Sequence, residues 1–399
     1  MLAKTSTGDA RARAGRTFRL LIGSYSEALP HAAGDGPGVI VARLSPSGLL
    51  EAEPDAAALP VRNASYLSPW VRRRDGKGWC CYAVNEVGSD LSVTTADSGS
   101  TGVENGGVTV LGLPNMHAPS VVLGQARTGG AGPAYASVTP DGRWLLVANY
   151  VGGNASALPI RDDGSIAEPV AVFEHDGAGP ITARQERPHP HAALTDPAGR
   201  WWYVVDLGID AVVGYSFQDG KGKRDDAATL TLPPGSGPRH LIFASSAGQT
   251  TNPNLAYLNL ELSGEVAALR HHPQNGAWEM IQRIPARAET GSTHESIQPS
   301  ELALTRDERW LVLANRVCDV VSLFACDPKS GRLAPVADFP TGRTPRHLAW
   351  SPDDRFLVVA EQDEGRVTVY EFDREGGALI KHEQKLAVGS PCFVRFYPA

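Results

Sequence analysis

Histidine, arginine and glutamate recur at two fixed places in a pattern of short apolar runs along this 399-residue chain. One set stands where a run begins: His189, His191, Arg239, His240, Glu301, Arg346 and His347. The other set stands where the following run ends: Glu86, Tyr150, Asp206, Glu261, Arg316 and Glu361. Imidazole transfers protons near neutral pH, and guanidinium groups bind carboxylates, phosphates and oxyanions. These residue types therefore predict acid–base chemistry on an anionic molecule, provided that the fold brings them together.

The runs belong to one repeated unit of four strands. They are of strand length, rich in β-branched and aromatic residues, and bounded by turns that contain Gly, Pro or Asp. First runs occupy 132–143, 189–200, 237–248, 298–309 and 344–355, and second runs occupy 144–150, 201–207, 254–262, 310–316 and 356–362. Third runs occupy 210–217, 264–271, 319–326 and 365–372, and fourth runs occupy 164–173, 331–339 and 377–388. Four antiparallel strands repeated every ~45–60 residues are typical of β-propeller blades.

The two ends of the chain each supply part of one further unit. Three runs near the start lack a first strand, and one run at the end has nothing after it: 19–25, 38–45, 49–58 and 390–398. Joined, they complete a blade and close the ring, which leaves no edge strand unpaired. A more divergent second blade is predicted at 63–70, 79–86, 107–113 and 119–126. The prediction is an all-β, seven-bladed propeller over 18–399, with a flexible tail at 1–17 and polar insertions at 87–106 and 285–297.

A propeller places the two sets of polar residues on the same face. The first strand of each blade lines the central channel, and successive strands run antiparallel. The start of the first strand and the end of the second strand therefore lie at the same mouth of the channel. The opposite face carries ordinary turns such as Asp141-Gly142. We expect the chemistry at the first of these mouths.

Composition excludes several classes of protein. The net charge is −7, and the basic runs are short, so we expect neither nucleic acid nor a membrane surface as a partner. No run approaches the roughly 18 apolar residues of a membrane helix, and the polar N-terminal segment does not read as a secretory signal. The five cysteines have no CxxC or zinc spacing, which favours reduced residues in the cytoplasm. No metal and no cofactor is expected.

Several segments together resemble the lactonase seven-bladed propeller family. They are GSGPRHLIF at 235–243, ELS at 261–263, ANRVCDVVSLF at 314–324, the stretch 344–362, GSPCFV at 389–394 and ARQERPHPH at 183–191. The family includes propeller-type 6-phosphogluconolactonases and fungal 3-carboxy-cis,cis-muconate lactonising enzymes. The resemblance implies an active-site set of His191, Arg239, Glu261 and Arg316. The family usually has Asn directly before this glutamate, whereas here Leu260 holds that place and the asparagine is Asn259.

The residue types suggest a role for each member of this set. Arg239 and Arg316 would bind an acidic group and polarise a carbonyl. His191 would take a proton from water, since an arginine neighbour makes Glu261 the weaker base and leaves it an orienting role. Arg184, His189, Arg346 and Glu86 are predicted substrate-binding residues. His189 and His191 could pair on a metal, but the segment offers no third ligand.

The sequence leaves the reaction open between alternatives. The preferred function is hydrolysis of a small anionic lactone of a sugar acid or phosphosugar. A cycloisomerase that converts a muconate dicarboxylate to its lactone is the alternative within enzymes. A non-catalytic binding propeller is the alternative of another class. A gluconolactonase-like calcium site would need Glu86, Asn149 and Asp206 to converge.

Overall fold

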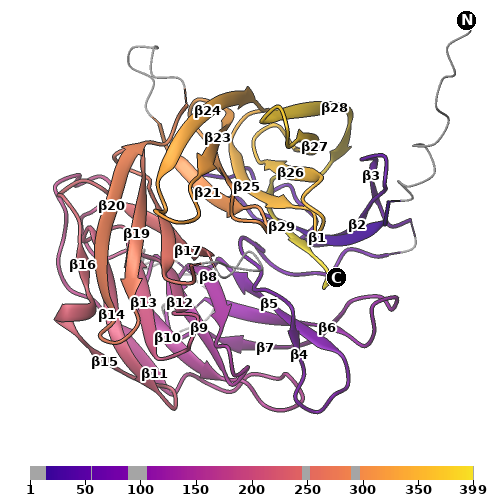
Figure 1. Ribbon diagram of the computed structural model, residues 1–399. Helices are drawn as coiled ribbons and strands as arrows, with labels where there is room; N and C mark the ends of the chain where they lie inside the picture. Colours follow the sequence, from indigo (N-terminus) through magenta and orange to yellow (C-terminus); the bar gives the residue numbers. More distant parts are fainter. Residues whose placement is uncertain (1–14, 55, 89–105, 245–251, 289–296, 399) are drawn as a thin grey trace, which may run out of the picture.

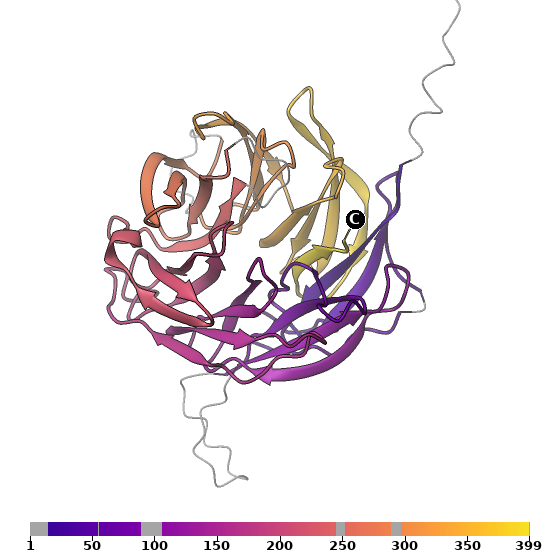
Figure 2. The same ribbon diagram turned by 60° about the horizontal axis from the view of Figure 1, so that its bottom comes forward.

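The computed structural model describes residues 15–54, 56–88, 106–244, 252–288 and 297–398. Within these residues the chain forms seven antiparallel sheets, which Figures 1 and 2 show arranged around a common centre. The predicted seven-bladed propeller is therefore confirmed. The predicted tail at 1–17 stays a prediction, since 1–14 lie outside the described residues and β1 begins at Phe18. No helix in the described part of the chain is long and apolar enough to cross a membrane.

The ring is closed by the two ends of the chain. This blade combines β29 (Pro391–Phe396), β1 (Phe18–Ser24), β2 (Val39–Leu44) and β3 (Leu50–Ala52), in that order. β29 and β1 are antiparallel, and their register runs from Leu20 opposite Phe396 to Ser24 opposite Pro391. The predicted closure is thus confirmed, because hydrogen bonding satisfies what would otherwise be two edge strands.

The next three blades follow in chain order. The second contains β4 (Val71–Arg72), β5 (Trp79–Asn85), β6 (Gly107–Leu113) and β7 (Val121–Arg127). The third contains β8 (Pro133–Val138), β9 (Trp144–Asn149), β10 (Asn154–Pro159) and β11 (Ala171–Glu174). The fourth contains β12 (Pro190–Thr195), β13 (Trp201–Asp206), β14 (Ala211–Gln218) and β15 (Lys221–Arg224), and after the 3-10 turn η1 (Asp226–Ala228) the short β16 (Leu230–Thr231) also pairs with β14.

The last three blades are the most regular. The fifth contains β17 (Pro238–Phe243), β18 (Leu255–Leu260), β19 (Glu265–His272) and β20 (Ala277–Pro285). The sixth contains β21 (Pro299–Leu304), β22 (Trp310–Asn315), β23 (Val320–Cys326) and β24 (Leu333–Pro340). The seventh contains β25 (Pro345–Trp350), β26 (Phe356–Glu361), β27 (Arg366–Asp373) and β28 (Ala378–Ala387). The predicted insertion at 285–297 begins too early, since Pro285 still pairs with Glu265; residues 289–296, like 89–105 of the other insertion, lie outside the described residues.

The first strand predicted at 63–70 is irregular instead. The strand of this blade that pairs with the inner side of β5 is β4, which begins only at Val71, after the predicted range. Within that range Leu67 forms an isolated bridge with Ala83. The Ser68 side chain accepts the N–H of Tyr82, a donor that a regular ladder would give to a backbone carbonyl. Pro69 follows directly and has no N–H to donate. The segment therefore runs beside β5 without forming a continuous strand.

Packing between blades holds the inner strands in place. The second strands are buried almost throughout, as in LLVAN of β9 and LVLAN of β22, because neighbouring blades cover both of their faces. First strands of adjacent blades contact each other, as β12 does with β8 and β17, and β25 with β21 and β29. A polar residue at the inner end of one blade is thus held against residues of the next.

Candidate active site

A β-bulge at the start of the inner strand aims side chains into the channel in every blade except the second. In β12, Pro190 pairs with Asp206 and Ala192 with Val205, so His191 is an extra residue without a partner. In β17 the register shifts between Pro238 and Leu241. Comparable shifts leave Ala134, Ser300, Arg346 and Cys392 as the extra residues of their strands. Because a bulge redirects a side chain, six of the seven blades each deliver at least one such position to a common centre.

One pocket collects most of these bulged residues. It is lined by Ser65, Tyr66, Glu86, Ala134, His191, Arg239, His240, Glu301, Arg346, His347 and Cys392. The members come from inner-strand starts and from the end of one second strand, as the propeller geometry requires. The pocket therefore lies at the mouth of the channel where the sequence predicted the chemistry.

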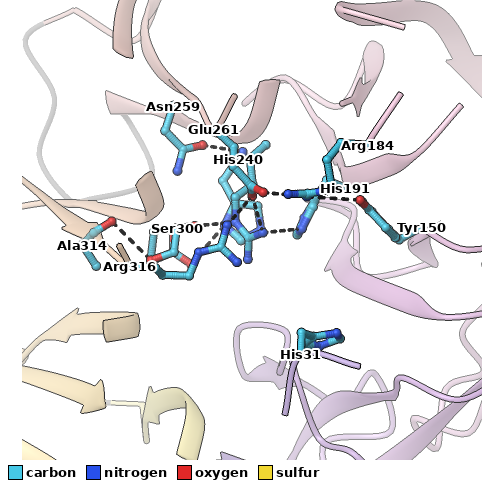
Figure 3. A network of polar contacts seen from close by, with 12 residues as sticks. His31, Tyr150, Arg184, His191, His240, Asn259, Glu261, Ser300, Ala314 and Arg316 are labelled. Carbon is cyan, nitrogen blue, oxygen red and sulfur yellow. Dashed lines mark hydrogen bonds and ion pairs between the residues drawn. The ribbon is translucent and has the colours of Figure 1, made fainter. Parts of the chain in front are cut away.

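A cluster of three arginines around one carboxylate adjoins this pocket (Figure 3). The Oε1 of Glu261 lies 2.6 Å from Nη2 of Arg184, and its Oε2 lies 2.8 Å from Nη1 of Arg239 and 2.7 Å from Nη2 of Arg316. Burial would raise the pKa of Glu261, but the charges of Arg316, Arg239 and Arg184 hold it well below its ordinary value. Glu261 is therefore an ionised carboxylate whose two oxygens contact three guanidinium groups, and its orienting role stays a prediction.

Arg239 is the centre of the cluster. Its Nη1 also contacts Nε2 of His191 at 2.6 Å, and its Nε donates to the carbonyl of Ser300 at 2.7 Å. Burial and the charge of Arg316 lower the pKa of Arg239 to about 10, so its guanidinium remains charged at neutral pH. Arg184 differs, since 36% of its side chain is exposed, which places it at the opening of the cluster.

The geometry gives His191 a role other than the predicted base. A guanidinium group has only donors, so Nε2 of His191 must accept from Arg239 and the ring proton must sit on Nδ1. Nδ1 is buried and has no hydrogen-bond partner among the described residues. Burial and the charge of Arg239 lower the pKa of His191 well below 6.5. His191 is therefore a neutral imidazole that offers a donor, not a lone pair, to the pocket.

A second group of polar residues faces the pocket from the first two blades. The Tyr25 hydroxyl donates to Oε2 of Glu86 at 3.0 Å, and Nε2 of His31 lies 3.4 Å from Oε1. Burial would raise the pKa of Glu86, but His31 and Arg346 lower it to about 2. The guanidinium of Arg346 lies over the ring of Tyr25. Glu86 and Arg346, both predicted substrate-binding residues, thus reach the same pocket.

A buried triad of two histidines and a glutamate lies on the far side of the pocket. Oε2 of Glu301 is 3.1 Å from Nδ1 of His240 and 3.2 Å from Nε2 of His347. Burial would raise the pKa of Glu301, but His240 and His347 hold it well below its ordinary value. The sequence signal for all three residues was their position at strand starts, but they were not included in the predicted site.

Positive charge outweighs negative charge at this mouth. Four arginines, Arg184, Arg239, Arg316 and Arg346, meet the carboxylates of Glu261 and Glu86, while Glu301 is matched by two histidines. Buried charge that is not balanced within the protein favours a ligand of opposite sign. The arrangement therefore suits a small anion.

Three of the polar residues at the starts and ends of the runs belong neither to the pocket nor to the arginine cluster. His189 stacks on the ring of Tyr150, and its ring nitrogens face the Tyr150 carbonyl and Glu186. Asp206 accepts from the backbone of His189 and contacts His175. Glu361 contacts Arg366 of the adjacent strand at 2.5 Å and turns along its own blade. The ring of His189 thus supports Tyr150, and its substrate-binding role stays a prediction.

The residues of the calcium alternative are also apart. Asn149 donates to Asn154 and Ser156 within the third blade, whereas Asp206 is held by His175. Among the described residues no group of three His, Cys, Asp or Glu side chains is placed to hold a metal ion. The expected convergence of Glu86, Asn149 and Asp206 is thus not found.

Comparison with known proteins identifies the family. The sequence model described as "Lactonase, 7-bladed beta-propeller" matches residues 19–396. The chain belongs to this family. A 6-phosphogluconolactonase of Bacillus subtilis is 32% identical over 292 residues, which are 73% of this chain and 80% of the relative. A 6-phosphogluconolactonase of Formosa agariphila is 26% identical over 275 residues, which are 67% of this chain and 75% of the relative.

A solved structure of a family relative supports the same assignment. The periplasmic gluconolactonase of Pseudomonas aeruginosa superposes with a TM-score of 0.81 at 32% identity, over 96% of this chain and 99% of that chain. The resemblance seen in the sequence is therefore confirmed, and with it the assignment to the lactone hydrolases. Asn259, one place before the expected position, accepts the backbone N–H of His240 at 2.7 Å, while Glu261 still reaches the arginines.

Proposed function

We propose that this lactonase hydrolyses a small anionic sugar lactone and that 6-phosphogluconolactone is its substrate. The observation that carries the proposal is the excess of arginine at the pocket, since four guanidinium groups face two carboxylates there. Two relatives named as 6-phosphogluconolactonases support the choice of a phosphorylated lactone. Hydrolysis needs only water as the second reactant, so the proposal includes no metal and no cofactor.

The arginines divide the binding between them. Arg184 is the most exposed of the four and is placed to meet the phosphate as the substrate arrives. Arg239 and Arg346 line the pocket and Arg316 joins them through Glu261, so they can hold the lactone carbonyl and the negative charge that develops on it. Glu261 is a positioning residue, because its two oxygens fix the three guanidinium groups before substrate binds. Glu86 accepts from the Tyr25 hydroxyl, and its charge also acts on Arg346.

His191 completes the polarising set. Its Nδ1–H has no partner and is buried beside the pocket, where it can donate to the carbonyl oxygen or to the attacking water. Water adds to the carbonyl carbon, the π electrons move to the oxygen, and the tetrahedral intermediate collapses with cleavage of the ring C–O bond. The product is the open-chain hydroxy acid. Donors fixed in advance lower the barrier because they need no reorganisation as the charge forms.

The test is a comparison of substrates with the purified full chain. We expect turnover of 6-phosphogluconolactone well above the uncatalysed rate, with slower turnover of the unphosphorylated lactone. The Arg184→Gln variant should raise KM for the phosphorylated substrate about tenfold and leave KM for the unphosphorylated lactone within twofold, since one charge-assisted contact is worth ~1.5 kcal/mol. Conversion of a carboxymuconate but of no lactone would support the cycloisomerase instead, and no turnover of either would support the binding propeller.

We also propose that the protein works in the cytoplasm without nucleic acid or membrane as a partner. In the described part of the chain Cys80, Cys81, Cys326 and Cys392 form no disulfide, which suits a reducing compartment. The acidic net charge of −7 disfavours anionic polymers and lipid surfaces. Because the Pseudomonas relative is described as periplasmic, fractionation of cells that express the native chain is the test of this proposal. Recovery in a periplasmic fraction would overturn it.

A further inference from the structure

His240 presents an unoccupied basic nitrogen to the pocket. Its Nδ1 lies 3.1 Å from the carboxylate of Glu301, which can only accept, so the ring proton of a neutral His240 sits on Nδ1. Its Nε2 then carries a free lone pair. That atom is buried and has no hydrogen-bond partner among the described residues, and His240 lines the pocket. An accessible lone pair beside bound substrate is what a general base needs.

Glu301 is held so that it can fix this tautomer. Its Oε1 accepts the backbone N–H of Leu302 at 2.9 Å. His347 takes the N–H of Val394 on its Nδ1, so its own proton is on Nε2 and is donated to Oε2 of Glu301. Three donors, from His240, Leu302 and His347, therefore converge on one carboxylate. Glu301 therefore fixes the tautomer and the orientation of the His240 ring, as the buried carboxylate of a catalytic triad does for its histidine.

Packing prevents the ring of His240 from turning away. The backbone N–H of His240 is held by Oδ1 of Asn259 at 2.7 Å. The ring stands edge-on to Tyr66 and Tyr135, with centroid distances of 5.9 and 5.3 Å. The bulge in β17 then turns Arg239 and His240 together toward the channel.

His191 and His240 offer complementary atoms to one small space. Their ring centroids are 5.1 Å apart, and His191 presents a donor where His240 presents an acceptor. The cavity that both line has a volume of about 10 Å³, close to the minimum that holds one water molecule. A water placed there can accept from Nδ1 of His191 and donate to Nε2 of His240. Its remaining lone pair is then free to attack a carbonyl carbon above it.

We propose that His240 is the general base of lactone hydrolysis, with Glu301 as its positioning residue. Nε2 of His240 takes one proton of the water as the water oxygen bonds to the carbonyl carbon. Collapse of the tetrahedral intermediate breaks the ring C–O bond, and the imidazolium returns the proton to the leaving alkoxide. The hydroxy acid that forms loses its own carboxyl proton to solvent. The assignment rests on the proposed lactonase function and adds a residue to it.

The loss of activity on the acid side of the pH profile should reflect the protonation of His240. Burial lowers its pKa below 6.5, whereas the charge of Glu301 opposes that shift. The groups that face the ring are Glu301, His347, His191, Arg239, Glu261 and the phenols of Tyr66 and Tyr135. Activity is expected to fall as pH drops through the pKa of His240. In Glu301→Gln, loss of the negative charge should lower that pKa and move the fall to lower pH.

The experiment compares His240→Asn with Glu301→Gln on the lactone that wild type hydrolyses. Asparagine keeps a donor toward Glu301 but has no atom at Nε2, so kcat should fall ~10²–10⁴-fold with KM within threefold. Glu301→Gln should lower kcat and shift the acid limb to lower pH. Added imidazole should restore part of the activity of His240→Ala. His271→Gln is the matched control, since His271 is buried and hydrogen-bonded to Tyr203 outside the pocket.

The outcomes separate the two proposals. If wild type hydrolyses no lactone, the proposed function fails and the base assignment falls with it. If wild type is active and a folded His240→Asn keeps kcat within threefold, only the base assignment is overturned. If His240→Asn does not fold, Glu301→Gln decides: an unmoved acid limb rejects the role of His240, and a limb moved to lower pH supports it.

Discussion

The two mouths of the channel differ in how their charges are used. The cavity toward the opposite mouth has a volume of about 560 Å³. Its lining mixes apolar side chains such as Phe243, Leu348 and Trp350 with polar ones, and it shares Glu301 and His347 with the first pocket. Its charged residues are occupied locally, since Arg306 donates to the carbonyl of Pro352 and Arg395 to that of Leu67. At the arginine-rich mouth the cavity is far smaller, yet several charges and two imidazole nitrogens face it.

Cavity volume does not indicate where the unpartnered polar groups of this propeller lie. The larger cavity lies where the turns between first and second strands meet, and its arginines contact neighbouring loops. The smaller one lies where bulges turn side chains from six of the seven blades to the centre. Unbalanced buried charge and unpartnered polar atoms cost stability, so their concentration in one place points to function.

The largest expected effect comes from Arg239, the centre of the arginine cluster. Arg239→Gln removes contacts to Glu261, His191 and the Ser300 carbonyl at once. We expect kcat/KM for the lactone to fall at least ~10²–10³-fold, the usual cost of losing a donor to a developing oxyanion. Steady-state kinetics measures this, with thermal unfolding to confirm that the variant is folded. A folded variant with a fall of less than tenfold would contradict the central role of Arg239.

Glu261→Gln should affect stability as well as activity. Glutamine leaves Arg184, Arg239 and Arg316 without their common counter-charge. Removal of one partner from a buried ion pair costs about 3 kcal/mol or more, so the free energy of unfolding should fall by that order. Inorganic phosphate should recover more of this loss in the variant than it adds to wild type, at matched ionic strength. Equal stabilisation of both proteins would mean that the cluster does not bind anions.

The pH dependence of stability should follow the buried histidines. The pKa values of His191, His240 and His347 are lowered by burial, and that of His271 is lowered to about 4. As pH falls through about 6.5, these histidines take up protons in the unfolded chain but stay neutral in the folded chain. Their contribution to stability is therefore complete above pH 6.5 and decreases as pH falls below it. Between pH 7.5 and 5.0 the free energy of unfolding should drop by at least ~1 kcal/mol. Urea unfolding at both pH values measures the drop, and a flat profile would contradict the assigned neutral histidines.

The smallest effect is expected at the opposite mouth. Arg306→Gln removes a guanidinium that lines the large cavity and contacts only the nearby Pro352 carbonyl in that region. We expect kcat and KM to stay within twofold of wild type, because the Arg306 guanidinium donates to the Pro352 carbonyl and the proposed reaction gives neither residue a role. Kinetics measured in parallel with Arg239→Gln gives the comparison directly. A tenfold loss would show that the far cavity takes part in turnover.

Most of the fold was predictable because the repeat is local. Apolar runs mark the strands of each blade and short polar motifs mark its turns. In the sixth and seventh blades the predicted runs overlap all four strands, whereas β20 of the fifth blade had no predicted run. The irregularity of the first segment of the second blade was not predicted because it has two local causes. The Ser68 side chain accepts a backbone N–H of β5, and Pro69 has no N–H to donate. The pattern of apolar residues does not show which backbone hydrogen bonds are lost in this way.

The site was predictable in part for a related reason. Position in the repeat put His191, Arg239, Glu261 and Arg316 in a larger set of polar residues at one mouth, and the resemblance to the lactonase family singled out these four. The structure brings them together. The same reasoning included Asp206 and Glu361, which are satisfied within their own blades. Whether a residue at a strand end turns to the channel or to its neighbour depends on local contacts that the pattern does not contain.

The sequence by itself determined the number of blades, the closure of the ring and the face where the polar residues meet, because these follow from strand periodicity and antiparallel connection. Tertiary structure alone decided the hydrogen-bond state of each imidazole. Arg239 occupies the lone pair of His191, and Glu301 frees that of His240. Those contacts join residues about fifty or sixty positions apart in the chain, and they are set by bulges and by packing between blades. Residue types indicate which groups can move a proton, but only their neighbours in space determine which of them does.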